Sequence, residues 1–269
     1  MIGYLQIIRP TVVLLAALAV FVGAFLSGFS SYPIILIAVI SASLIAAGGN
    51  ALNDYFDYRT DRINKPHRAI PSGKVKREDT LFFSSVLLIL GLVLSFFLAL
   101  PNILLALLNI FVIIVYNILL KRIPLVGNFC PSWLAASSFI YGGFLSSSIN
   151  STVILLFSIS FLANTGREIV KAIEDIAGDT RTDFKTLPVV VGKTFSILTA
   201  AVFVMLAVIF SAFPYLFNLL GNGYAVFVVI ADLLFVASLY YISDSAKKSQ
   251  NIMKIAMFIA MVAFIAGAL

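Results

Sequence analysis

Long apolar segments follow one another along almost the whole chain, and only short polar stretches separate them. A helix needs roughly 20 predominantly apolar residues to cross a bilayer. We therefore predict an all-α integral membrane protein, a single domain over residues 1–269, with nine membrane-spanning helices. The expected spans are residues 11–28, 32–52, 80–99, 102–119, 129–147, 152–173, 194–213, 222–243 and 251–268. Because the first window heads a series of similar segments, we interpret it as a span rather than a signal peptide.

Composition supports this class, and the basic residues predict the orientation. The chain is 61% hydrophobic and 11% charged, which lies outside the range of soluble proteins. All 18 Lys and Arg residues fall before the first span, near the junctions of spans 2/3, 4/5, 6/7 and 8/9, or in the adjoining helix ends. By the positive-inside rule, the N-terminus and these loops are expected to be cytoplasmic and the C-terminus outside. Because anionic lipid accounts for the net charge of +6, no nucleic-acid partner is expected.

Acidic residues gather at the ends of the second and sixth predicted spans. The two groups are Asn53, Asp54, Asp57 and Asp61, and Asp175, Asp179 and Asp183. Apart from Asp54, the members of each group are four residues apart, so each group shares one helix face and forms an acidic stripe. Two facing stripes offer hard oxygen ligands, which suit Mg²⁺ carrying a phosphorylated substrate.

Each stripe also has a purely structural interpretation. The first could be a solvated helix end, although like charges within two turns repel and the macrodipole disfavours anions at a helix C-terminus. The second could be neutralised along its own helix by pairs such as Lys171 with Asp175. The two stripes together favour a cation site.

Two connections on the basic side are longer than a turn between helices requires. They cover residues 53–79 and 174–193, directly after the second and sixth spans. Long loops in compact domains are typically functional or disordered. We expect these two to form cytoplasmic caps over the site.

The residues of the first stripe carry a family resemblance. Residues 53–61, Asn-Asp-Tyr-Phe-Asp-Tyr-Arg-Thr-Asp, fit the N-D-x-x-D-x-x-x-D motif of the UbiA superfamily of intramembrane prenyltransferases. Residues 63–66, Arg68 and residues 71–73 look like the segment that follows this motif in the family. Residues 171–179 are similar to the family's second D-x-x-x-D motif. The resemblance covers essentially the whole chain and implies nine helices around a central cavity.

The resemblance also implies roles for individual residues. Mg²⁺ is expected between the stripes, holding a prenyl diphosphate, with Asn53, Asp57, Asp61, Asp175 and Asp179 as metal ligands. The expected catalytic residues are Asp54, Asp57, Asp61, Lys171, Asp175 and Asp179. The expected substrate-binding residues are Arg9, Asn50, Asn53, Arg68, Tyr116, Lys121 and Tyr141. Cationic side chains would stabilise the leaving diphosphate, and Tyr116 and Tyr141 would shield an allylic cation.

The acceptor is read from residues 165–171, Thr-Gly-Arg-Glu-Ile-Val-Lys, which look most like the archaeal ether-lipid branch of this superfamily. That likeness implies transfer of a geranylgeranyl group from its diphosphate to the hydroxyl of geranylgeranylglyceryl phosphate, a membrane-embedded lipid phosphate. An aromatic quinone precursor or a chlorophyllide-like acceptor stays open within the same mechanism. An ion-coupled transporter is the alternative from another class, but transporter acids cluster near the bilayer midplane. Asp232, in the middle of the eighth span, is either part of a site or bonded to a polar neighbour.

Overall fold

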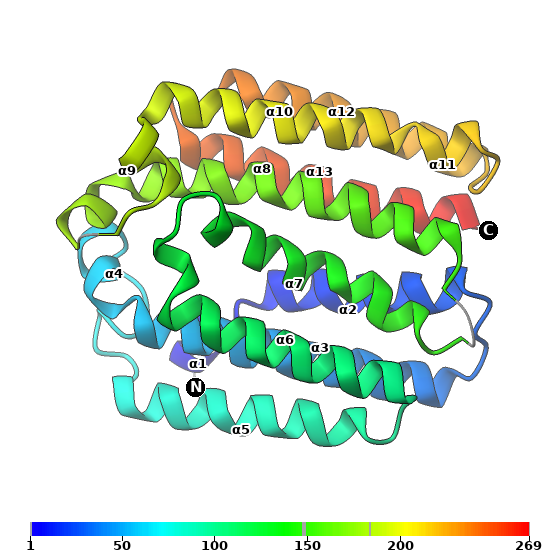
Figure 1. The fold of residues 1–269 in the computed structure, drawn as a ribbon, viewed down its shortest axis with the longest axis horizontal. Coiled ribbons are helices and arrows are strands. Elements are labelled where there is room, and N and C mark those ends of the chain that lie inside the picture. Colours follow the sequence, from blue (N-terminus) through cyan, green and yellow to red (C-terminus); the bar gives the residue numbers. More distant parts are fainter. Residues whose placement is uncertain (1, 147–148, 183, 269) are drawn as a thin grey trace.

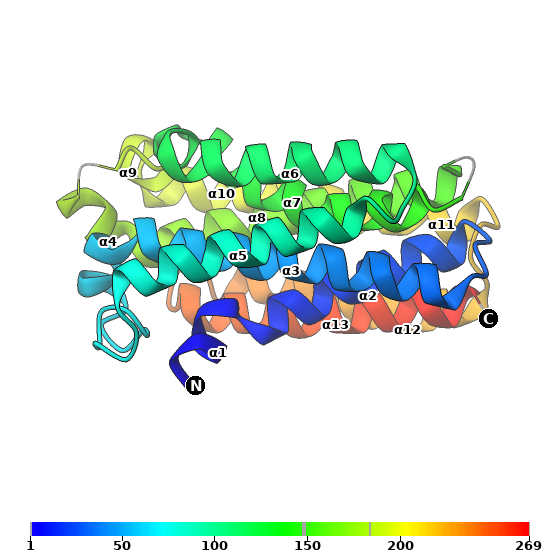
Figure 2. The ribbon, with the colours of Figure 1, turned by 90° about the horizontal axis from the view of Figure 1, so that it is seen from below.

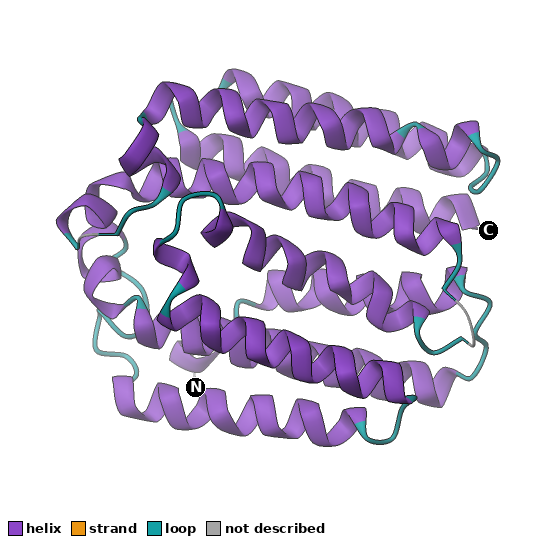
Figure 3. Cartoon of the chain, viewed as in Figure 1, coloured by secondary structure: helices purple, strands orange, loops and turns teal. Residues whose placement is uncertain are grey.

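The computed structural model describes residues 2–146, 149–182 and 184–268, and in these ranges the chain is helical without any β-strand (Figure 3). The long helices are α2 (Pro10–Leu26), α3 (Tyr32–Phe56), α5 (Arg77–Ser95), α6 (Leu100–Ile118), α7 (Val126–Gly143), α8 (Ser151–Arg181), α10 (Lys193–Ser211), α12 (Asn222–Tyr240) and α13 (Ala246–Ala268). Shorter ones are α1 (Ile2–Ile8), α4 (Tyr58–Asn64), η1 (Leu120–Arg122), α9 (Leu187–Val191) and α11 (Phe213–Leu216). The all-helical prediction is confirmed.

The long helices lie side by side and run roughly along one common axis (Figure 1). Seen from below, α6 lies at one face of the bundle and α12 and α13 lie at the opposite face (Figure 2). Large apolar side chains such as Phe82, Phe97 and Phe111 are exposed on the outside. An apolar outer surface of this kind is stable in contact with lipid. The long apolar helices indicate the same environment.

Close helix packing depends on small residues, most clearly between α2 and α7. A Cβ atom added to Gly142 would lie 2.0 Å from the carbonyl oxygen of Val20, and one added to Gly23 would lie 2.1 Å from that of Phe139. Helices in membranes often approach each other through such small residues, because apolar side chains gain little by leaving lipid. The two glycines therefore allow the backbones of α2 and α7 to touch.

Seven helices of the described residues are long and apolar enough to cross a membrane, or eight if the bent pair of α1 and α2 counts as one span. The chain is thus a multi-pass membrane protein by length and composition. Of the nine predicted spans, the one at 129–147 corresponds to α7, which is not among these helices. Its buried polar residues include Asn128, Ser132, Ser137 and Ser138, and Pro131 lies within it. The number of nine spans stays a prediction.

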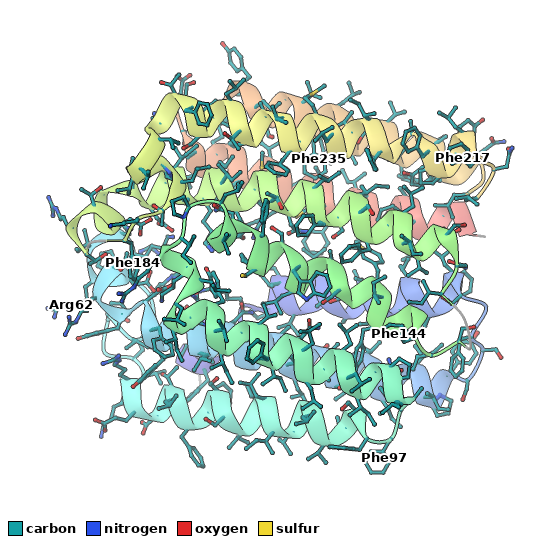
Figure 4. The ribbon with its side chains drawn as sticks, in the orientation of Figure 1. Arg62, Phe97, Phe144, Phe184, Phe217 and Phe235 are labelled. Carbon is teal, nitrogen blue, oxygen red and sulfur yellow. The ribbon has the colours of Figure 1, made fainter. Side chains whose placement is uncertain are left out.

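Connections rich in polar residues meet at one end of the bundle, here called the charged end. It comprises the segments at residues 57–76, 119–125, 184–192 and 241–245. Figure 4 labels Arg62 and Phe184 there, whereas Phe97 and Phe217 lie at the opposite end. The two long connections of the sequence lie here and are partly helical, as α4 and α9.

Asp232 contacts a neighbouring helix rather than the charged end. The hydroxyl of Ser211, at the end of α10, donates to Asp232 Oδ2 at 2.7 Å. Of the two interpretations left open for this residue, the contact agrees with bonding to a polar neighbour between helices.

Candidate active site

The first acidic stripe lies where α3 passes into α4. The helix is interrupted at Asp57, yet the N–H of Asp57 still donates to the carbonyl of Asn53 at 2.9 Å, and the N–H of Asp61 to that of Asp57 at 2.8 Å. The helical spacing of four residues therefore continues through the interruption. The side-chain amide of Asn53 also donates to Asp57 Oδ2 at 2.8 Å, so these two polar groups lie on one face, as predicted.

The second stripe lies at the end of α8, and Asn64 of α4 contributes two hydrogen bonds between the stripes, beside the contact of Thr60 with Thr182. Asn64 donates through Nδ2 to the carbonyl of Asp175 at 2.8 Å and accepts through Oδ1 from the N–H of Gly178 at 2.9 Å. Gly178 makes this approach possible, since a Cβ there would lie 2.4 Å from Asn64 Nδ2. Asp183, the last member of the predicted stripe, lies outside the described residues.

Both stripes face one small pocket of about 80 Å³, here called the polar pocket. The predicted residues that line it are Asn53, Asp57, Asp61, Arg68, Tyr116, Lys121, Lys171, Asp175 and Asp179. Four carboxylates from segments more than one hundred positions apart therefore share a single hollow. The expectation that the stripes oppose each other agrees with this arrangement.

Basic side chains pair with three stripe carboxylates of the polar pocket, whereas Asp179 accepts from the hydroxyl of Thr186. Lys121 Nζ lies 2.6 Å from Asp57 Oδ1, and Lys65 Nζ lies 2.5 and 2.6 Å from the two oxygens of Asp175. Arg68 Nη1 donates to Asp61 Oδ2 at 2.6 Å. Burial raises the pKa of the Asp61 carboxyl above its ordinary value, and the charge of Arg68 offsets only part of this effect.

Lys171 differs from the prediction in its partner. The sequence suggested a pair with Asp175 one turn further along α8, but Lys171 Nζ lies 2.9 Å from Glu168 Oε2. The cause is competition, because Lys65 occupies both oxygens of Asp175. Arg167 Nη1 contacts the other oxygen of Glu168 at 2.6 Å.

Asp54 is buried beside the polar pocket but lines neither of the cavities described here. Arg9 donates to its Oδ1 and also to Asn53 Oδ1 at 3.1 Å. Arg68 Nη1 lies 3.4 Å from the same carboxylate. Asp54 therefore orients two arginines that reach toward the site.

A second, much larger cavity of about 950 Å³ adjoins the polar pocket and runs between α2, α3, α6, α7, α8 and α13. The two spaces share lining residues, among them Asn53, Tyr116 and Lys171. Predicted residues that line the large cavity and not the polar pocket are Arg9, Asn50 and Tyr141. Its deeper wall is apolar and includes Leu15, Leu134, Ile159, Met261 and Phe264. A ligand with a polar head and a long apolar tail fits this shape.

The two tyrosines occupy different depths of the site. Tyr116 lines both spaces, whereas Tyr141 lines only the large cavity, where its hydroxyl lies 2.8 Å from that of Ser41. Lys121, in turn, lies over the rings of Phe56 and Phe184, 5.5 and 5.3 Å from their centroids. A cation in the polar pocket thus already lies over aromatic faces, and Tyr116 is the tyrosine at the junction of the two spaces.

A divalent ion fits the chemistry of the polar pocket, although the donors are not gathered into a finished metal site. No group of three or more Asp, Glu, His or Cys side chains is close enough to hold a metal among the residues that the structure describes. The oxygen donors that line this one hollow are Asn53, Asp57, Asp61, Asp175 and Asp179. Basic side chains pair with three of them, Asp57, Asp61 and Asp175. Hard oxygens of this type are preferred by Mg²⁺.

Sequence reasoning missed Asn64, which ties α4 to α8, and Lys65, which neutralises Asp175. Both fall in the segment at residues 63–66 that resembles the family, which was the signal available. Lys65 is one of several basic residues in the long connection, and nothing in the sequence alone ranks it above Arg62 or Lys74.

A helical membrane bundle with two opposed acidic stripes beside an apolar cavity fits an intramembrane enzyme whose ligand has an anionic head and an apolar tail. Residues 13–262 match the model of the UbiA prenyltransferase family, and the chain belongs to this family. It is 36% identical to the digeranylgeranylglyceryl phosphate synthase of Methanosphaera stadtmanae over 99% of both chains.

Solved structures agree with this assignment. One reported for a digeranylgeranylglyceryl phosphate synthase in membranes has a TM-score of 0.76 and 36% identity, covering 99% of this chain and 97% of that one. A UbiA homologue from Archaeoglobus fulgidus bound to DMAPP and Mg²⁺ has a TM-score of 0.70 at 17% identity, covering 98% and 99%. The second likeness shows the shared fold.

Proposed function

We propose that this chain transfers a geranylgeranyl group from geranylgeranyl diphosphate to the free hydroxyl of geranylgeranylglyceryl phosphate, and that residues 1–269 act as one domain. The observation that carries the proposal is the polar pocket, in which Asp57 and Asp61 face Asp175 and Asp179 next to a long apolar cavity. The relatives named for this activity match over nearly their full length. The cavity volume of about 950 Å³ lies in the range of sites that enclose whole ligands.

Mg²⁺ would be held by Asn53, Asp57, Asp61, Asp175 and Asp179. When bound, the metal neutralises the negative charge that develops on the leaving diphosphate. Its binding requires the basic side chains to leave the carboxylates. Because these side chains carry the opposite charge to the substrate, they are well placed to contact the diphosphate instead.

The remaining residues of the site act on the reacting carbon, C1 of the allylic group, and on the leaving and attacking oxygens. The allylic C1–O bond breaks, and its electron pair leaves with the diphosphate, where Arg68, Lys121 and Lys171 stabilise the charge. Tyr116 and Tyr141 border the space in which the allylic cation forms. The acceptor's hydroxyl oxygen then bonds to C1, and its proton passes to the departing diphosphate.

Arg9, Asn50 and Asp54 shape the mouth of the site. Asn50 donates to the carbonyl of Ile8 at 2.9 Å, which places the start of α2, and therefore Arg9, over the pocket. Asp54 holds the guanidinium of Arg9 through its hydrogen bond. We infer that this trio positions Arg9 toward the bound diphosphate.

The membrane arrangement that suits this reaction has nine spans, and α7, predicted from the sequence at residues 129–147, is one of them although it is not among the helices long and apolar enough to cross a membrane. Its polar residues face the bundle and its neighbours α2 and α8 flank it, so lipid need not solvate them (Figure 1). The charged end lies on the cytoplasmic side by the positive-inside rule, with α4 and α9 as caps over the polar pocket. The C-terminus then lies outside.

The direct test supplies purified protein in lipid nanodiscs with geranylgeranyl diphosphate, Mg²⁺ and a panel of acceptors, and identifies products by mass spectrometry. The proposal expects a digeranylgeranylglyceryl phosphate product. Preference for an aromatic acid or a chlorophyllide-like acceptor would move the chain to another branch of the family. An intact donor with every acceptor would contradict an enzymatic role and favour transport.

A further inference from the structure

The wall of the large cavity formed by α8 and α13 carries basic side chains that the acidic stripes do not use. Arg167 of α8 and Lys247 and Lys254 of α13 line the large cavity but not the polar pocket. The polar residue Asn251 of α13 lies on the same wall. Positive charge is therefore present at two separate places, one around the carboxylates and one beside them.

A hydrogen bond between the two helices fixes where this wall lies. Gln250 of α13 donates to Glu174 of α8. The two helices are antiparallel, since α8 ends and α13 begins at the charged end (Figure 1). Moving away from that end, Arg167 lies about two turns from Glu174 and Lys254 about one turn from Gln250. Both side chains therefore lie deeper than the hydrogen bond, on the membrane side of it.

Carboxylates balance the charges on this wall only in part, since Arg167 pairs with Glu168. Neither Lys247 nor Lys254 forms a salt bridge with any described residue. Arg167 uses one nitrogen on Glu168, an acid that it shares with Lys171, while its buried Nε has no hydrogen-bond partner in the described part of the chain. Glu174 lines the same cavity, and its carboxylate accepts the hydrogen bond from Gln250.

Unbalanced charge within a membrane bundle is costly and points to a ligand of opposite charge. Lys247 and Lys254 are exposed and line the cavity, so they are accessible to a molecule inside it. Arg167 offers a planar guanidinium with several N–H donors, and Lys254 offers a compact ammonium charge. Both groups commonly bind phosphate.

We propose that Arg167 and Lys254, helped by Lys247 and Asn251, bind the phosphate monoester of the acceptor lipid. This inference rests on the proposed function and deepens it, because it assigns the donor's diphosphate to the polar pocket and the acceptor's phosphate to the wall of α8 and α13. With its phosphate held there, the acceptor's hydroxyl lies between the two anionic groups, next to the junction of the cavities. The wall is thus a specificity-determining site that favours a phosphorylated acceptor over a neutral one.

The test compares two acceptors, geranylgeranylglyceryl phosphate and its phosphate-free alcohol, in nanodiscs of zwitterionic lipid so that no anionic headgroup competes. The variants are Lys254→Gln, Arg167→Gln and the conservative Lys254→Arg. The matched control is Lys248→Gln, an exposed residue of α13 that stacks on Tyr241 and does not line the cavity. Kinetic constants for donor and acceptor are measured separately for each variant.

We expect Lys254→Gln and Arg167→Gln to raise the KM of the phosphorylated acceptor about tenfold or more. The KM of the donor and the turnover of the phosphate-free alcohol should stay near those of the unmodified protein, and Lys254→Arg should restore most of the acceptor affinity. A wild-type enzyme that is active and prefers the phosphorylated acceptor, with unchanged kinetics in both Gln variants, would overturn the inference alone. A rise confined to the KM of the donor would also overturn the inference, because the side chains of α8 and α13 would then bind the donor's diphosphate rather than the acceptor's phosphate. A wild-type protein inactive with both acceptors would instead count against the proposed function.

Discussion

Replacing Asp57 by Asn is the sharpest test of the acidic stripes, because it removes one charge and almost no volume. Asp57 contacts Lys121 at 2.6 Å and Asn53 at 2.8 Å. An amide in its place keeps an oxygen that can accept one of these hydrogen bonds. Lys121 also keeps its contacts with the rings of Phe56 and Phe184. The folded state should therefore lose only about 1–3 kcal/mol, the range for an imperfectly satisfied buried polar group.

The effect of the same substitution on the reaction should be larger than its effect on folding. A group that stabilises charge in the transition state typically contributes about 2.7–4 kcal/mol, or about 10²–10³ in rate. We expect Asp57→Asn to lower kcat by at least about 100-fold while the protein still inserts and melts cooperatively. Turnover is followed by product mass spectrometry and folding by the thermal midpoint in detergent. The matched control is Asp244→Asn, an exposed carboxylate at the charged end that lines neither cavity. Turnover of Asp57→Asn within about threefold of this control would refute the role given to the stripe.

Three further outcomes are expected. Chelation with EDTA should abolish turnover and added Mg²⁺ should restore it, whereas activity that survives exhaustive chelation would contradict the metal assignment. Gly142→Ala should destabilise the protein by about 1–3 kcal/mol and lower its thermal midpoint. The reason is that the new Cβ would lie 2.0 Å from the carbonyl oxygen of Val20. An unchanged midpoint would argue against this contact between α2 and α7. In a Cys130→Ser background, an impermeant maleimide on right-side-out vesicles should label Asn218→Cys and spare Ser72→Cys until the membrane is opened, and the reverse pattern would invert the proposed orientation.

The helical fold was predictable because its main determinant is local. Apolar runs of span length leave the chain few alternatives to helices in a bilayer. The predicted span at residues 129–147 is the least clear of the nine, because its helix, α7, contains Asn128 and Pro131 and is not among the helices apolar enough to cross a membrane. Such residues are tolerated where neighbouring helices satisfy them, and a composition window does not contain that tertiary information.

The acidic stripes were predictable for a similar reason, since spacing along one helix decides which residues share a face. Their pairing partners were not, because these come from distant segments. Lys171 was expected to contact Asp175. Instead, Lys65, from the loop after α4, contacts that carboxylate, and Lys171 contacts Glu168. Only the docking of Asn64 against the end of α8 brings Lys65 close enough.

The most direct measurement of the central claim is anomalous scattering from Mn²⁺ in crystals grown with a non-reactive analogue of the prenyl diphosphate. If both stripes coordinate the metal ions of one metal–diphosphate complex, Mn²⁺ should give anomalous density between α4 and the end of α8. That density should lie within bonding distance of Asp57 or Asp61 on one side and Asp175 or Asp179 on the other. Density coordinated by a single helix, or absent from the polar pocket while the analogue is bound elsewhere, would contradict the account.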